Sequence, residues 1–145
     1  MINIQVETQL DKSLGNLIRD LTFKKPLKNS VELLKKETQQ NFDQQGRIYG
    51  TWRPLAKSTR IQRSRLGYGA ARPILVRTGR LKKGFVTSST DKKAEISNTV
   101  KYAAVHQYGG RRIPQRKILD VSAKSEKAIG LIFANFIGEK IKKYL

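Results

Sequence analysis

Few residues in this chain are of types that could carry out catalysis or bind a metal, and their spacing favours neither. The 145 residues include one histidine, His106, no cysteine and 11 acidic side chains. A catalytic triad or a zinc site needs a carboxylate or a second ligand beside the histidine, and no acidic residue lies near His106 in the sequence. No two acidic residues stand closer than four positions apart, so paired-carboxylate chemistry would require distant residues to meet. We interpret His106 as structural and expect no catalytic residue, cofactor or metal.

The segment Gly-Tyr-Gly-Ala-Ala-Arg at residues 67–72 is the only glycine-rich pattern that invites comparison with a phosphate-binding loop. Such a loop ends in Gly-Lys-Ser/Thr, and this segment has neither the lysine nor a third glycine. We predict a turn without phosphate-binding chemistry. A small basic ribonuclease would have to use arginine, lysine and tyrosine in place of histidine, and no pattern in the chain favours one.

Positive charge is the pattern that predicts an interaction. The chain has 30 Lys+Arg against 11 Asp+Glu, a net charge of +19, which indicates a polyanionic partner or an acidic protein face. No acid lies between Asp43 and Asp91, whereas 11 basic residues do. This concentration is typical of a binding surface, and a solvated face is the alternative. The basic surface that we predict comprises Arg47, Arg53, Lys57, Arg60, Arg63, Arg65, Arg72, Arg111 and Arg112.

Three aromatic residues, Tyr49, Trp52 and Tyr68, lie within this basic region. Aromatic rings between basic residues can stack on nucleic-acid bases. Trp52, however, is followed by Arg-Pro-Leu, and this context favours an anchor that holds the loop to the core.

The first 46 residues predict a short strand followed by two helices. Apolar residues alternate with polar ones over residues 2–6, which indicates a half-buried strand. Leucines and an isoleucine recur at helical spacing over residues 10–21, and Pro26 ends that run. A second helix over residues 27–42 is closed by Gly46.

The middle of the chain predicts a long loop and then a hairpin. Glycines and prolines interrupt every period over residues 47–75, so we expect a basic loop with one short helix at residues 57–65. Residues 81–86 and 94–100 predict two antiparallel strands across the polar turn 87–93.

The last third predicts an extended segment at residues 113–119 and a final helix capped by Asp120 or Ser122. The predicted apolar face of that helix consists of Ile129, Ile132, Phe133, Phe136, Ile137, Ile141 and Tyr144.

Together these elements predict an α+β fold, in which a small antiparallel sheet is flanked by N-terminal helices and a C-terminal helix, with a long basic loop. A chain of this length fits one domain over residues 1–145. No apolar run reaches the roughly 18 residues that a membrane span needs and no signal peptide is recognisable, so we expect no membrane partner.

A series of short motifs runs from residue 41 to residue 120. In order they are Asn-Phe, Trp-x-Pro-Leu, a threonine, Leu-x-x-Thr-Gly-x-Leu, Tyr-Ala-x-x-His-Gln-x-Gly and Ile-Pro-x-Arg. This order and spacing resemble the phage virion morphogenesis family, the tail-completion and neck proteins of Mu-like tailed phages. The matching residues are Asn41, Phe42, Trp52, Pro54, Leu55, Thr59, Leu75, Thr78, Gly79, Leu81, Tyr102, Ala103, His106, Gln107, Gly109, Ile113, Pro114 and Arg116. The chain departs from the family at Gln115, often alanine, and at Lys117-Ile118, often proline and an aromatic residue.

The resemblance implies a structural protein without enzymatic activity, which completes or terminates the tail and supports head–tail joining as a ring-forming neck subunit. It would belong to the tail or neck of the virion and be assembled in the bacterial host cytoplasm. The implied partners are other copies in a ring, expected to be a hexamer, and the tail tube and head–tail connector proteins, with DNA in the lumen as a further contact. A head-to-tail ring needs two different patches on each subunit, which the basic loop and the opposite helical face could supply.

The motif residues then have scaffold and interface roles. Gly79 and Gly109 would permit turns, Pro114 would stiffen the chain, and Arg116 would offer its fork of donors to a neighbouring subunit. The full predicted set is Trp52, Pro54, Leu55, Thr59, Thr78, Gly79, Leu81, Tyr102, His106, Gln107, Gly109, Ile113, Pro114 and Arg116. The alternative function is a basic nucleic-acid-binding protein that uses its charge on phosphates directly.

Overall fold

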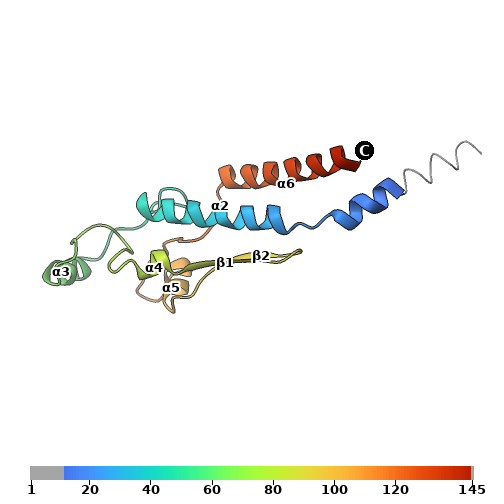
Figure 1. The fold of residues 1–145 in the computed structure, drawn as a ribbon. Coiled ribbons are helices and arrows are strands. Elements are labelled where there is room, and N and C mark those ends of the chain that lie inside the picture. The colour runs from blue at the N-terminus through green and yellow to red at the C-terminus, as the bar shows by residue number, and fades with distance from the viewer. Residues whose placement is uncertain (1–11, 145) are drawn as a thin grey trace, which may run out of the picture.

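The computed structural model describes residues 12–144, and its elements are arranged around one long central helix (Figure 1). This helix, α2, packs against α6 on one side and against the hairpin β1–β2 on the other. The elements in chain order are a helix over residues 12–20, α2 (Lys24–Asp43), α3 (Lys57–Arg65), α4 (Arg80–Lys83), β1 (Phe85–Ser89), β2 (Ala94–Asn98), α5 (Ala103–Tyr108) and α6 (Ala123–Tyr144). The α+β fold is thus confirmed, although α6 covers α2 rather than the sheet.

Both long helices lie where the apolar spacing predicts them. In α2, Pro26 occupies the first turn, where a missing N–H costs nothing because that group has no partner within the helix. At the start of α6, Ser122 Oγ accepts a hydrogen bond from Ser125 N at 3.1 Å, which confirms Ser122 as the cap. The helix over residues 12–20 confirms most of the first predicted helix, whereas the strand predicted at residues 2–6 lies outside the described residues.

The hairpin is confirmed, but its predicted bounds are partly wrong. Residues 87–89 belong to β1, which leaves residues 90–93 as the turn, and residues 81–83 lie in α4 rather than in the first strand. Strands β1 and β2 are antiparallel, in a register that runs from Phe85 opposite Asn98 to Ser89 opposite Ala94. Alternate residues of β1 face α2, because side chains point to opposite faces along a strand. Phe85 is buried on that face and Thr87 Oγ1 donates to Glu32 Oε1 on α2 at 2.7 Å. The sheet therefore rests on α2 through one face.

The hydrophobic core lies where α2 ends, between the hairpin and the loops. Its buried members are Phe42, Trp52, Ile74, Leu81, Phe85, Val100, Ala103 and Ile118. The ring of Phe42 meets those of Trp52 and Phe85 edge-on, at centroid distances of 5.2 and 6.1 Å. Trp52 is only 4% exposed, so its predicted role as a core anchor is confirmed and base stacking by this ring is excluded. Burial of each such ring stabilises the fold by about 1.5–3 kcal/mol.

The predicted apolar face of α6 is partly wrong. Phe133 and Phe136 do face the rest of the molecule, with centroids 6.0 and 5.9 Å from that of Phe23. Ile137 and Ile141 are instead 37% and 40% exposed, because the predicted face spans a wider arc than α2 can cover. No helix among residues 12–144 is long and apolar enough to cross a membrane.

The middle of the chain contains α3, which was predicted, and two short helices that were not. At one end of the molecule, α3 projects away from the α2 axis (Figure 1). The φ angles are 77° at Gly79, just before α4, and 84° at Gly109, just after α5, so both predicted turns are confirmed. The segment 113–119 runs without helix or strand apart from a bridge between Gly110 and Ile113.

Candidate interaction surface

One backbone carbonyl, that of Lys117, ties two distant parts of the chain together. It accepts hydrogen bonds from Trp52 Nε1 at 2.9 Å and from Asn41 Nδ2 at 3.3 Å. The same asparagine uses Oδ1 to accept from the backbone N–H groups of Ile48 and Tyr49, at 3.1 and 3.3 Å. Asn41 is fully buried, so each of these bonds also satisfies a polar group removed from water. The loop that follows α2 is thereby fixed at its base.

Arg116 contributes to the same arrangement, and its predicted contact with a neighbouring subunit is wrong. The side chain is 5% exposed, with Nε donating to Arg53 O at 2.9 Å and Nη2 to Pro54 O at 3.0 Å. Nε and Nη2 of the guanidinium are thus both occupied within the chain. Burial, and secondly the charge of Arg53, lowers the pKa of Arg116 from its usual range.

Gln107 completes the set by holding α5 to the segment that follows it. Its Oε1 accepts from the backbone N–H groups of Ile118 and Leu119, at 2.9 and 3.0 Å, and its Nε2 donates to Leu119 O at 2.8 Å. We call the side chains of Asn41, Trp52, Gln107 and Arg116, with the backbone groups they bind, the clamp. All four belong to the predicted motifs, and all four hold the fold.

Beyond the clamp, residues 57–73 form a projecting segment that we call the arm, made of α3 and the turn after it. Arg63 is the buried residue of α3, at 5% exposed, and its Nη1 donates to Pro73 O at 2.9 Å. Its prediction as part of the basic surface is therefore wrong, because this guanidinium ties α3 to the returning chain. Tyr68 is partly exposed on the arm, with the guanidinium of Arg77 5.7 Å from its ring centroid.

The other predicted basic residues do lie at the surface. They are Arg47, Arg53, Lys57, Arg60, Arg65, Arg72, Arg111 and Arg112. Among residues 12–144, ion pairs form at Lys82, Lys93, Lys117, Lys140 and Lys143, and none involves these eight. The charge of the basic surface is therefore not neutralised by the described part of the chain.

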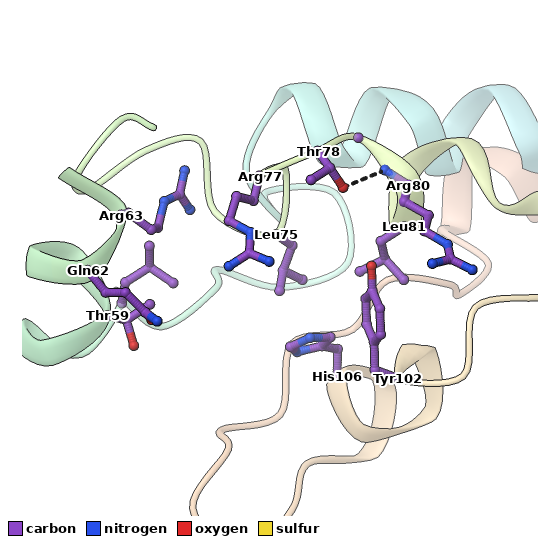
Figure 2. Close-up of a pocket in the computed structure, with 12 residues that line it drawn as sticks. Thr59, Gln62, Arg63, Leu75, Arg77, Thr78, Arg80, Leu81, Tyr102 and His106 are labelled. Atoms are coloured by element: carbon purple, nitrogen blue, oxygen red, sulfur yellow. Dashed lines mark hydrogen bonds between the residues drawn. The ribbon is translucent and has the colours of Figure 1, made fainter. Parts of the chain in front are cut away.

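A groove of about 240 Å³ separates the arm from α4 and α5 (Figure 2). Leucines contribute much of its apolar wall, with Leu81 buried and Leu55 and Leu75 half-buried. The polar lining residues come from both sides and are Thr59, Gln62, Arg63, Arg77, Thr78, Arg80, Tyr102 and His106. The groove thus combines hydroxyl and guanidinium groups with an apolar floor.

His106 lines this groove from α5. Its ring is half-buried and meets the ring of Tyr102 edge-on, with centroids 6.0 Å apart. Burial, and secondly the charge of Arg116, lowers the pKa of the imidazole, so His106 is neutral at pH 7. Its Nδ1 is buried without a hydrogen-bond partner. The histidine is packed, as predicted, but one polar atom remains unsatisfied at the groove.

The structure thus divides the predicted motif residues between the clamp, the core and the groove. Thr59, Thr78, Gly79, Tyr102 and His106 line the groove together with Leu55 and Leu81. Pro54, Gly109, Ile113 and Pro114 lie outside it. Sequence reasoning did not single out Gln62, Arg77 or Arg80 as site residues, although the two arginines flank the Thr78-Gly79 motif that was recognised.

This surface has the chemistry of a binding site. Among residues 12–144 there is no cluster of three or more His, Cys, Asp or Glu that could hold a metal ion. A comparison with protein-family models shows which family the chain belongs to. The model of the phage virion morphogenesis family matches residues 5–137. The chain belongs to this family. Comparisons with curated proteins and with solved structures found no match.

Membership in the phage virion morphogenesis family confirms the resemblance carried by the motif series and gives the protein a structural role in building the phage virion. The family match, over residues 5–137, includes the residues of the clamp, the arm and the groove.

Proposed function

We propose that this protein is a ring-forming neck subunit that completes or terminates the phage tail and supports its joining to the head. The observation that carries the proposal is the basic surface, which is exposed on and around the arm and has no ion pair among residues 12–144. A basic surface that is not neutralised suits docking to another component better than it suits solvation alone.

The same geometry fits an assembly of several copies. A ring of identical subunits requires two different patches on each subunit. The arm at one end of the molecule and the outer side of α6, where Ile137 and Ile141 are exposed, are two such patches (Figure 1). We expect a hexamer, with the tail tube and the head–tail connector proteins as further partners.

Electron microscopy of particles assembled without this gene tests the proposal directly. We expect full heads beside unjoined or overlong tails, and recovery of joined particles when the gene is supplied in trans. Normal joined particles from the deletion would overturn the proposal.

A second candidate function is direct binding of nucleic acid, which the eight exposed and unpaired basic residues favour. Binding to phosphates releases counterions, so the logarithm of the affinity should fall by roughly 0.7–0.9 per log unit of salt for each phosphate neutralised. A titration of the purified protein with duplex DNA at several salt concentrations measures that slope. A flat slope would leave protein docking as the role of the basic surface.

A further inference from the structure

We propose that the groove between the arm and α4–α5 binds a segment of a different protein, in which an apolar side chain stands beside carboxylates. This inference rests on the proposed function and deepens it by naming the chemistry of a docking partner. The groove offers what such a segment requires: an apolar floor, and arginine and threonine side chains that line it.

The floor indicates that the ligand has an apolar part. Leu55, Leu75 and Leu81 all line the groove, and the two half-buried ones leave apolar surface open to it. An apolar side chain gains about 25 cal/mol for each Å² of its surface that the floor removes from water. A phosphate backbone has no group that would use this floor. The leucines therefore favour a protein segment over nucleic acid.

The rim indicates that the ligand also carries negative charge. Arg77 and Arg80 are exposed, line the groove and have no ion pair within residues 12–144. In Figure 2 the side chain of Arg77 stands between α3 and His106. The hydroxyl groups of Thr59 and Thr78 add donors, and guanidinium groups favour the two-oxygen geometry of a carboxylate. The groove can thus receive one or two acidic side chains.

The backbone at Leu75 is an independent sign that the groove is built for binding. This leucine has a φ of 59°, in the left-handed region that residues other than glycine rarely adopt. Such a conformation is strained and persists only when neighbouring groups impose it. Here the preceding N–H, that of Ile74, donates to Gln45 Oε1 at 2.5 Å. The fold therefore maintains a strained backbone at the residue that forms part of the floor.

Residues 12–144 of a second copy of this chain do not fit as the occupant. The exposed acidic residues without an ion pair among them are Glu32, Asp91, Glu126 and Glu139. Each has a lysine within three positions in the sequence, so these parts of another copy would bring as much positive charge as negative. Charge complementarity therefore favours an acidic segment of a different protein over residues 12–144 of a second copy.

The single histidine provides a site-specific reporter for the test. His106 lines the groove, so its imidazole resonances in a two-dimensional NMR spectrum report occupancy there without assignment of other residues. A carboxylate bound nearby would raise the pKa of His106, against the opposing charge of Arg116. The probes are a short peptide that repeats Leu-Asp-Glu, an equally charged peptide that repeats Gly-Asp-Glu, and a short DNA duplex.

We expect the leucine peptide to shift the His106 resonances, to raise its pKa and to bind at least about tenfold more tightly than the glycine peptide, a difference of 1.4 kcal/mol. The variant R77Q/R80Q should lose at least about tenfold in affinity for the leucine peptide. The charge-matched control K127Q/K142Q, on exposed positions of α6, should bind the leucine peptide as the unchanged protein does.

Equal binding of the two peptides, an unchanged His106 spectrum or equal losses in the two variants would each overturn the inference. Stronger perturbation of His106 by the duplex than by the leucine peptide would assign the groove to nucleic acid and overturn it as well. The peptide comparison uses the unchanged protein, so it does not depend on how the variants fold. Failure here would leave the tail-completion proposal intact, because that proposal is tested by particle morphology.

Discussion

The residues of the clamp lie on both sides of the arm in the sequence, and the two regions are built in opposite ways. In the clamp, buried side chains bind backbone groups that lie many residues away, and almost every polar atom has a partner. In the arm, Arg63 is the one residue of α3 that is buried, and the charged side chains around it face solvent. The motif residues of the clamp thus maintain the fold, whereas the arm carries one residue of the motif series, Thr59. Substitutions in the two regions should therefore separate stability from assembly.

The largest contrast is expected from one substitution made at two glycines. Both Gly46 and Gly67 have positive φ, 90° and 76°, so alanine costs about 1–2 kcal/mol at either position. At Gly46 a Cβ would stand 2.4 Å from ring atoms of Trp52, whereas at Gly67 nothing lies within 4 Å. Overpacking adds about 1–3 kcal/mol at the first position alone. Chemical denaturation followed by circular dichroism should show G46A to be the less stable variant, and equal losses would contradict the tight packing against Trp52.

The substitution R116K should have the next largest effect. Lysine keeps the charge but cannot donate to both Arg53 O and Pro54 O, which leaves one of these carbonyls without its partner. We expect a loss of about 1–3 kcal/mol in the free energy of unfolding. The same change at the exposed Arg111 should stay within about 0.5 kcal/mol. If R111K were as destabilising as R116K, the role of Arg116 in the clamp would be refuted.

A smaller effect, visible only as a dependence on pH, is expected at His106. The folded-state pKa lies below the unfolded value of about 6.5, so the unfolded chain takes up the proton first as the pH falls. The contribution of neutral His106 to the free energy of unfolding is complete above about pH 6.5, and it is lost as the pH falls through the folded-state pKa. Relative to H106Q, the protein should therefore lose stability between about pH 8 and pH 5. Denaturation at a series of pH values checks this, and parallel curves for the two proteins would contradict it.

Three carboxylates change the stability of the protein in a more acidic range of pH. They belong to Asp20, Glu95 and Asp120. Their pKa values are lowered mainly by hydrogen bonds, from Tyr144, Lys93 and Lys117 respectively, so their contributions are lost at more acidic pH. Above about pH 5, the dependence of stability on pH therefore reports the protonation of His106 rather than that of these carboxylates.

The smallest effect on stability, together with a large effect on assembly, is expected in the arm. The variant K57Q/R60Q/R65Q removes three exposed charges from α3. Removing a cation from the first turn of a helix and another from the last changes its stability by a few tenths of a kcal/mol in opposite directions, so the net change should be within about 0.5 kcal/mol. Joined particles in a complementation assay should nonetheless fall sharply, whereas the control K28Q/K92Q, at exposed positions on α2 and in the hairpin turn, should complement fully. Full complementation by the arm variant would remove the arm from the assembly interface.

Much of the fold could be predicted from the sequence because its long elements have clear periods. Residues 27–42 and the helix after Ser122 show helical spacing, and the hairpin strands flank a polar turn, so local physics suffices for each. The helices α4 and α5 escaped prediction because four and six residues are too short to establish a period. The motif residues around Gly79 and Gly109 were correctly assigned to turns.

The site was less predictable because burial of an arginine depends on the tertiary structure. Nothing in the local sequence distinguishes Arg63 and Arg116 from their exposed neighbours, since the carbonyls that bind them come from Pro73, Arg53 and Pro54. The groove could not be predicted from the sequence for the same reason, because its walls come from the arm, α4 and α5. A sequence shows which residues are basic but not which carbonyls will meet them.

The hydrogen bonds to Lys117 O also have a consequence for the order of folding. They join residues 76 and 65 positions apart, whereas α2 and the hairpin need only local contacts. Closing a longer loop costs more entropy, and contacts between distant residues form slowly. We therefore expect helix and hairpin to be present in the transition state and the clamp to close after it, so that substitutions in the clamp accelerate unfolding more than they slow folding. The residues most easily recognised in the sequence would then be the last to reach their native positions.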